Sequence, residues 1–448
     1  MKHTSTLMIA GVRSVLHLLG AASCAFVLAL PAAAAPDPLG VGAIYPELDA
    51  LYIDLHQTPE LSFHEEKTAA KMAERLRRLG FEVTTGVGRT GVVGVLRNGA
   101  GPTVLLRTDL DALPVEEKTG LPYASKVKAR NDAGEVVPVM HACGHDVHMT
   151  SWIGAATLLS RGRDRWRGTV VMVGQPAEEI VAGAAAMLAD GLYTRFPKPD
   201  YALAVHDHAL LPAGQVGFVP GFALSNMDTV EVTLYGRGGH GANPHRTVDP
   251  VLLAAKTVVA LHTIVSREIN AQDPAVVSVG SIHGGTKSNI IPEEVKLQIT
   301  VRSYKEEVQK QLLAAIARVA KGEAAAAGSP REPTISVDPR GSTRATFNDE
   351  VLTARLTAVL RRTLGDENVV PFQREMGSED FSEYGHAGAP AVLFWVGATE
   401  PQKFAEAKAK GVSPPFQHSP NFAPDRERTI RTATTTLTIS ALELLGKP

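Results

Sequence analysis

Short apolar runs alternate with helical stretches between about residues 45 and 221, and this alternation narrows the possible folds more than any other feature of the sequence. Runs typical of strands occur at residues 92–96, 103–107 and 169–173, and the spacing of apolar side chains predicts helices over residues 60–79 and 152–159. Strands separated by helices favour a largely parallel sheet with helices on its faces. We therefore predict a mixed α/β domain whose sheet is mainly parallel.

A second pattern begins at about residue 223 and predicts a smaller domain inserted into the first. Its strands and helices follow in the order β-α-β-β-α-β, over residues 229–235, 250–269, 276–282, 294–301, 306–326 and 334–337. This order is the split-βαβ, or ferredoxin-like, arrangement. Residues 229–235 alternate strictly between the two faces of a strand, and we expect them to form an edge strand that pairs two chains across a two-fold axis.

The residues after the inserted block contain too few strands to fold alone, so we expect them to complete the first domain. Predicted helices over residues 349–364 and 426–445 flank a single strong strand at residues 391–396. The chain then divides into a first part of the larger domain (36–222), the inserted domain (223–340) and a second part of the larger domain (341–448).

The first 35 residues have the pattern of an export signal. Lys2 and Arg13 precede an apolar stretch, and residues 32–35 are all alanine, which supplies small side chains for cleavage. We expect a mature chain that begins near Ala35 or Pro36 and is periplasmic or secreted. The alternative is an uncleaved membrane anchor, because the apolar stretch approaches the roughly 17 residues that can span a bilayer.

The charge of the chain argues against nucleic-acid binding, and its cysteine content argues against an internal disulfide. The formal net charge is −2 and no run of lysine and arginine occurs, so nothing favours nucleic acid as a partner. The sequence contains only Cys24 and Cys143, and removal of the signal leaves Cys143 alone, without an internal disulfide. A single thiol in an oxidising compartment must be buried or occupied by a ligand.

Residues 140–148, with the sequence MHACGHDVH, are the segment richest in potential metal ligands. Cys143 and His145 are two residues apart and cannot share a helix face, so we expect them on a turn that bends at Gly144, with Asp146 capping the helix that follows. Cysteine and histidine ligands suit zinc or a similar metal. The alternative is a buried cysteine beside capping and surface histidines.

Three further segments contain candidate ligands. Glu178 and Glu179 follow an apolar strand that Pro176 ends, and adjacent carboxylates are best explained if a cation neutralises one of them. His206 follows another apolar run, at the strand ends where ligands gather in α/β proteins. His418 lies in a proline-rich loop. Taken alone, a glutamate pair is more often a solvated loop, and a single histidine is more often structural.

The combination resembles a known family, the co-catalytic metallopeptidases that include aminoacylases and glutamate carboxypeptidases. The resemblance is closest to the amidohydrolase branch that contains hippurate hydrolase and the indole-acetyl-amino-acid hydrolases. It rests on stretches that run in the family's order across nearly the whole mature chain: residues 107–114, 141–146, 175–179, 236–245, 284–292, 377–381 and 418–420. So many matches in one order are far beyond chance.

The resemblance implies a fold and a site. The fold is a metal-binding α/β domain with an inserted split-βαβ domain that often forms a homodimer. The site holds two divalent metal ions, zinc first, with manganese, cobalt or nickel as alternatives, on Cys143, His145, Glu179, His206 and His418. The further implied roles are Glu178 as general base, His240 as the residue that steadies the oxyanion in the partner subunit's site, Asn289 as a substrate contact and Asp109 as a residue that orients a ligand. If Glu178 is the ligand, the two glutamates exchange roles.

The implied activity is hydrolysis of the amide bond of small N-acyl amino acids by metal-activated water. A di- or tripeptidase would share every catalytic residue and is the first alternative. A non-catalytic metal- or peptide-binding protein is the second, and it would be expected to have lost Glu178 or a ligand.

The sequence departs from the family's pattern at two places. His208 follows His206 closely, where the family has a small aliphatic residue next to the ligand, so His208 could compete for the metal. Arg107 stands where other members of the family have a histidine ligand, so Cys143 must supply that role.

Overall fold

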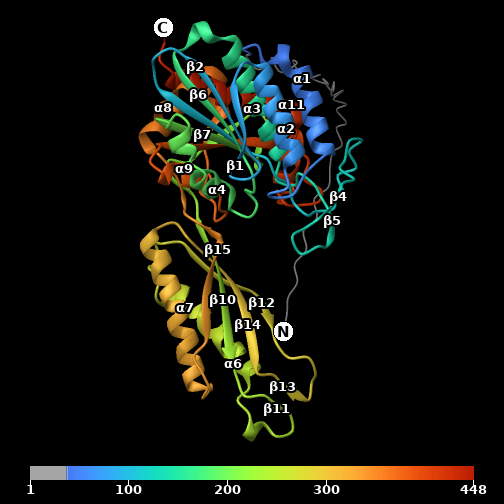
Figure 1. Cartoon of the computed structure of the whole chain (residues 1–448), viewed down its shortest axis with the longest axis vertical. Helices are drawn as coiled ribbons and strands as arrows, with labels where there is room; N and C mark the ends of the chain where they lie inside the picture. The colour runs from blue at the N-terminus through green and yellow to red at the C-terminus, as the bar shows by residue number, and fades with distance from the viewer. Residues whose placement is uncertain (1–36, 38, 448) are drawn as a thin grey trace, which may run out of the picture. The chain divides into compact units, whose positions relative to one another are not determined.

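The main sheet contains eight strands in the order β1-β2-β6-β3-β7-β18-β8-β17. Figure 1 labels β1, β2, β6 and β7 among them. The computed structural model describes residues 37 and 39–447, so the predicted export signal lies outside the described residues. The strands are β1 (Glu82–Val87), β2 (Gly91–Asn98), β3 (Thr103–Asp109), β6 (Gly168–Gln175), β7 (Tyr201–Pro212), β8 (Val216–Phe218), β17 (Val369–Pro371) and β18 (Ala391–Thr399). The central strands β6, β3, β7 and β18 are parallel neighbours, whereas β1, β2 and β6 pair antiparallel. The predicted mixed, mainly parallel sheet is confirmed.

Helices cover both faces of this sheet, as its apolar strands require. One face packs against α1 (Val41–Gln57), α2 (Glu66–Arg78), α3 (His145–Arg161), α8 (Glu350–Leu364) and α11 (Arg426–Leu444). The other packs against the shorter α4 (Gly183–Ala189), α5 (Leu192–Arg195) and α9 (Ser382–His386). The helix α10 (Pro401–Ala409) follows β18. Strand β18 lies between β7 and β8, so the residues after the inserted block complete the sheet, as predicted.

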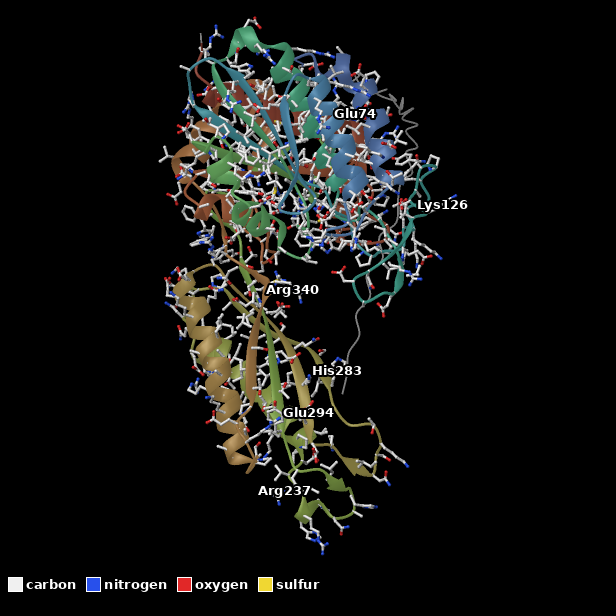
Figure 2. The ribbon with its side chains drawn as sticks, in the orientation of Figure 1. Glu74, Lys126, Arg237, His283, Glu294 and Arg340 are labelled. Carbon is white, nitrogen blue, oxygen red and sulfur yellow. The ribbon has the colours of Figure 1, made fainter. Side chains whose placement is uncertain are left out.

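The inserted block forms its own sheet and core. Its elements are β10 (Asn226–Tyr235), α6 (Pro250–Arg267), β12 (Ala275–His283), β14 (Glu294–Ser303), α7 (Glu306–Ala326) and β15 (Thr334–Thr343). The strand order β12-β14-β10-β15 with antiparallel neighbours is the predicted split-βαβ arrangement. Helices α6 and α7 pack on one face, and exposed polar side chains such as His283 and Glu294 occupy the strands (Figure 2). Although α6 is long and apolar enough to cross a membrane, its buried residues form this core.

Two predictions of local structure are wrong, and one helix was not predicted. The helix expected from residue 60 begins at Glu66, because Phe63 takes a left-handed backbone conformation (φ 60°) and residues 60–65 form a turn. The run at residues 229–235 belongs to β10, which lies inside its sheet, and the edges are β12 and β15. Helix α1, which contains Pro46, was not among the predicted elements.

The packing of α3 against α11 leaves no room for a side chain at Gly154. A Cβ atom there would lie 2.7 Å from Oγ1 of the buried Thr434 and 3.1 Å from Leu48 of α1. By contrast, a Cβ atom at the exposed Gly322 of α7 would meet nothing within 4 Å. The two glycines therefore differ in steric surroundings although both lie in long helices.

We expect the same substitution to act in opposite directions at these positions. Gly154→Ala should lower the free energy of unfolding by about 1–3 kcal/mol, because it overpacks a helix contact. Gly322→Ala should raise it by about 0.5–1 kcal/mol, because alanine has the higher helix propensity. Scanning calorimetry of the two variants checks both signs, and an equal shift in the same direction would contradict the packing argument.

Candidate metal centre

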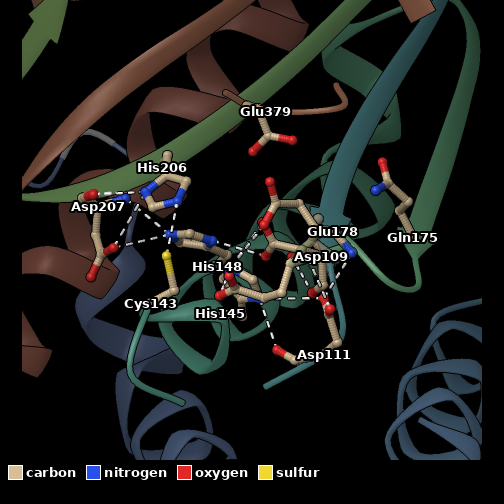
Figure 3. Close-up of polar contacts among 12 residues, drawn as sticks. Asp109, Asp111, Cys143, His145, His148, Gln175, Glu178, His206, Asp207 and Glu379 are labelled. Carbon is tan, nitrogen blue, oxygen red and sulfur yellow. Dashed lines mark hydrogen bonds and ion pairs between the residues drawn. The ribbon is translucent and has the colours of Figure 1, made fainter. Parts of the chain in front are cut away.

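The candidate residues meet at the carboxyl ends of the central strands and at the start of α3 (Figure 3). Strand β3 ends at Asp109, β6 ends at Gln175 just before the Glu178–Glu179 pair, and α3 begins at His145. His206 lies within β7, which continues to Pro212, so the prediction that it follows the strand is wrong. The strand continues because β18 pairs with it as far as Pro212.

Cys143 and His145 flank a tight turn, as predicted. Gly144 has φ 81°, a conformation that favours glycine, and a Cβ atom there would lie 2.2 Å from the Asp207 carboxylate. The prediction that Asp146 caps the helix is wrong, because Gly144 occupies that position. Asp146 instead lies in the first turn, where it accepts a hydrogen bond from Val147 N (2.9 Å) and contacts Nδ1 of His56 (2.6 Å).

His145 is oriented for metal binding. Its Nδ1 lies 2.8 Å from the Asp111 carbonyl oxygen, to which it can only donate, so Nε2 is left as the ligand atom. That Nε2 is buried and has no hydrogen-bond partner among the described residues. It lies 3.8 Å from Glu178 and 3.7 Å from Glu179. An unpaired nitrogen that faces two carboxylates is what a cation site requires.

The structure brings the five predicted ligands together. Nε2 of His206 lies 3.6 Å from the Cys143 sulfur, and Nε2 of His418 lies 3.3 Å from the same sulfur and 3.4 Å from Glu179. Potential ligand atoms lie within 4.8 Å of one another in the groups Cys143–His145–His206 and Cys143–Glu179–His418. These two groups both contain Cys143 and together include all five predicted ligands.

Burial opposes the ionisation of the acidic side chains in this cluster, and a bound cation would favour it. Burial raises the pKa of Glu179 to about 8 against the opposing effect of His145. Burial, with repulsion from Glu379 and Glu179, holds the pKa of Glu178 well above its usual range. Burial also raises the pKa of the Cys143 thiol. A divalent ion would reverse each of these effects by favouring the charged ligands.

Asp109 and Arg107 are buried beside the candidate ligands. Asp109 accepts a hydrogen bond from Arg107 (2.8 Å) and contacts Nδ1 of His148 (2.9 Å). It lies 3.7 Å from Nε2 of His145, so the direct hydrogen bond that orients this ligand comes from Asp111 rather than from Asp109. Arg107 also binds Glu379 (2.7 Å) and is fully engaged by its partners, as expected for a residue that is not a ligand.

His208 does not compete for the metal in this conformation. Its ring packs edge-on against Phe372, Trp395 and Phe416, with centroids 4.8–5.2 Å apart. Its Nδ1 accepts a hydrogen bond from Leu210 N. The aromatic neighbours therefore hold it away from the cluster that contains His206.

His240 and Asn289 lie together on the smaller domain. His240 ends β11 (Gly239–His240), which pairs with β13 (Ile290–Ile291), and Gly241 N donates to the Asn289 carbonyl oxygen. Both side chains are exposed. Within the described chain, the hydrogen bonds of His240 stay inside the smaller domain.

Two supporting carboxylates were missed by the sequence reasoning. Asp111 accepts hydrogen bonds from the backbone of Glu178 and Glu179, and Glu65 accepts one from Ala177. The spacing of Asp111 two residues after Asp109, on the same side of the chain, could have indicated it. Glu65 gave no signal, because it falls in a stretch whose charges resemble a solvated helix face.

Comparison with known proteins identifies a family. A model described as peptidase family M20/M25/M40 matches residues 105–413. Thermostable carboxypeptidase 2 of Saccharolobus solfataricus is 35% identical over 353 residues, which cover 78% of this chain and 85% of the relative. Hippurate hydrolase of Campylobacter jejuni is 35% identical over 337 residues, or 75% and 84%. The crystal structure of the Bacillus subtilis YXEP protein, described as a dinuclear metal-binding peptidase, superposes with a TM-score of 0.72 at 29% identity and covers 90% of this chain and all of that one.

Cys143 belongs to both groups of candidate ligands, so replacing it is expected to remove one metal ion. Serine is not ionised near neutral pH and is a poor ligand, so Cys143→Ser should reduce the metal content from two ions per chain to one. Plasma mass spectrometry of the purified protein measures this content. His208→Gln is the matched control and should keep both ions, because His208 faces aromatic side chains. Full metal content in Cys143→Ser would contradict the assignment of the shared ligand.

Proposed function

The chain belongs to peptidase family M20/M25/M40 and is a metal-dependent amidohydrolase or peptidase, and we propose that it hydrolyses N-acyl amino acids to release the amino acid. The observation that supports the proposal most is the buried Glu178–Glu179 pair facing the unpaired Nε2 of His145. Hippurate is itself an N-acyl amino acid, so the similarity to a hippurate hydrolase favours this substrate class.

We propose that Cys143, His145, Glu179, His206 and His418 hold two divalent ions, with zinc the first choice. When bound, such ions polarise the scissile carbonyl and lower the pKa of water. Glu178 takes the proton of the attacking water and passes it to the leaving amine. His240 donates to the developing oxyanion, and Asn289 contacts the carboxylate or carbonyl of the substrate.

The contacts of the two glutamates favour this division of roles over the reverse. Glu179 is grouped with Cys143 and His418, whose Nε2 lies 3.4 Å from its carboxylate. Glu178 is grouped with His145 and Glu179, and repulsion from Glu379 contributes to its raised pKa. A base must stay unligated, so Glu178 is the better candidate.

The second candidate function is cleavage of short peptides at a free carboxyl terminus, which the similarity to a carboxypeptidase favours. Such an enzyme uses the same ligands and base and differs in the pocket that receives the acyl group. A panel of N-acetyl, N-benzoyl and indole-acetyl amino acids together with dipeptides separates the two functions by the rates at which free amino acid is released.

We expect chelator-sensitive release from at least one N-acyl amino acid, restored by added divalent ions. Glu178→Gln should lower kcat by about 10²–10⁴-fold while keeping both metal ions, because the amide preserves shape but cannot accept the proton. The matched control is Glu82→Gln, at a largely exposed position paired with Arg97. Unchanged kcat in Glu178→Gln would exclude it as the base, and no release with any metal would exclude the proposed activity.

We also propose that export follows from residues 1–35, which lie outside the described residues. Their charged start, apolar stretch and alanine run support a cleavable signal. Mass spectrometry of the periplasmic protein tests this, since a retained segment would favour the membrane anchor.

A homodimer through the smaller domain is the third part of the proposal. Helix α6 exposes Val251, Leu252 and Val259, the last with 72% of its surface accessible, and it packs beside β12, an edge strand with the exposed Ile282. A free strand edge beside exposed apolar side chains favours pairing with a second copy. The edge that would pair is thus β12, not the predicted residues 229–235.

Val259→Lys should weaken this association roughly tenfold or more, because it would bury an unpaired charge. Analytical ultracentrifugation over a range of concentrations measures the dissociation constant. Val351→Lys is the matched control, since Val351 is 81% exposed on α8 of the larger domain. Activity should fall with the dimer if His240 acts in the partner's site. Equal behaviour of the two variants would contradict an interface on α6.

A further inference from the structure

Two carboxylates from distant segments bind three consecutive peptide N–H groups beside the proposed base. Oε1 of Glu65 accepts from Ala177 N (2.9 Å), Oδ1 of Asp111 accepts from Glu178 N (3.1 Å), and Oδ2 of Asp111 accepts from Glu179 N (3.0 Å). Both carboxylates are fully buried. The backbone of the loop is thus held from one side, while its two glutamate side chains face the candidate ligands.

The loop needs such support because its backbone is strained. Ala177 and Val181 take left-handed conformations with φ 49° and 48°, on either side of the glutamate pair. This region is unfavourable for residues with a Cβ atom, and most of all for a branched valine. Hydrogen bonds within the loop join Val181 N to the Glu178 carbonyl oxygen and Ala182 N to the Ala177 carbonyl oxygen, and the two carboxylates supply the bonds to the N–H groups of residues 177–179.

We propose that Glu65 and Asp111 are positioning residues that fix the catalytic loop, with Glu65 acting on the base and Asp111 on both the base and the metal ligand. The inference rests on the proposed function for the roles of Glu178 and Glu179. Glu65 reaches the loop from the turn before α2, through the one peptide that precedes Glu178. Asp111 reaches it from just beyond β3 and also orients His145 through its carbonyl oxygen.

The hydrogen-bond pattern of Glu65 does not require a negative charge. One oxygen, Oε1, accepts from both Phe63 N (2.7 Å) and Ala177 N (2.9 Å), while Oε2 accepts, among the described residues, only from the Thr90 hydroxyl (2.5 Å). A glutamine could keep both backbone bonds with its carbonyl oxygen and donate its amide to the hydroxyl, which can also accept. Burial raises the pKa of Glu65 to about 7, in keeping with a site that tolerates the neutral form.

The pattern of Asp111 does require two acceptor oxygens. Each oxygen accepts from a different peptide N–H, and Oδ2 also accepts from the Ser62 hydroxyl (2.6 Å). In either orientation, the amide of an asparagine would point N–H groups at one of the two peptide donors. The same carboxylate-to-amide change should therefore be harmless at Glu65 and harmful at Asp111.

The experiment compares Glu65→Gln, Glu65→Ala and Asp111→Asn, with Asp132→Asn at an 85% exposed side chain and Glu74→Ala on α2 as matched controls. Three readouts are taken: kcat and KM on the best substrate of the panel, calorimetric titration of the metal-free protein with Zn²⁺, and the unfolding midpoint. We expect Glu65→Gln to stay within about threefold of wild type in every kinetic and binding constant. Glu65→Ala should lose about 10²-fold in kcat with unchanged KM and zinc affinity.

Asp111→Asn should weaken zinc binding about 10–100-fold in addition to lowering kcat. Equal behaviour of Glu65→Gln and Asp111→Asn, or wild-type kcat in Glu65→Ala, would overturn the inference. If Glu65→Ala does not fold, the contrast between the two amide variants decides. If the wild type hydrolyses nothing, the proposed function fails, yet the zinc titrations still test whether Asp111 alone needs both oxygens.

Discussion

The burial of ionisable side chains at one site is the constraint on which the rest of the structure depends. Carboxylates, imidazoles and one thiol converge where the central strands end, and burial opposes ionisation of Glu178, Glu179 and Cys143. Such a cluster is unfavourable on its own and becomes favourable when divalent cations are bound. The scaffold must therefore be stable enough to hold the side chains together before the ions arrive.

The candidate ligands lie on segments of different kinds: a helix, a strand and loops. His145 begins a buried helix, and His206 lies inside a strand with parallel neighbours on both sides. The glutamate pair lies on a strained loop that carboxylates hold in place. His418 differs from the other ligands because its side chain is 56% exposed, and its loop is fixed by its backbone bond to Ala142 and by Gln417.

Sequence patterns predicted the elements that depend on local periodicity and failed where tertiary contacts decide. The parallel strands and the split-βαβ order follow from the periods of apolar side chains. The position of β10 inside its sheet does not, because a strand with one buried face alternates in the same way at the centre and at the edge. His206 was expected beyond its strand because polar residues usually end a strand, yet β18 supplies partners there. Glu65 looked like a surface charge, and only the fold shows that a loop more than 100 residues away donates to it.

The order of the strands also determines when the larger domain can form. Strand β8 pairs only with β17 and β18 in its sheet, and both follow the inserted block in the sequence. A chain synthesised as far as residue 222 therefore has no partner for β8 and leaves one edge of β7 open. The smaller domain has all its strands in one continuous segment and can fold earlier. The larger domain is therefore completed last, and until β18 is synthesised the edge of β7 offers unpaired N–H and C=O groups to any other strand.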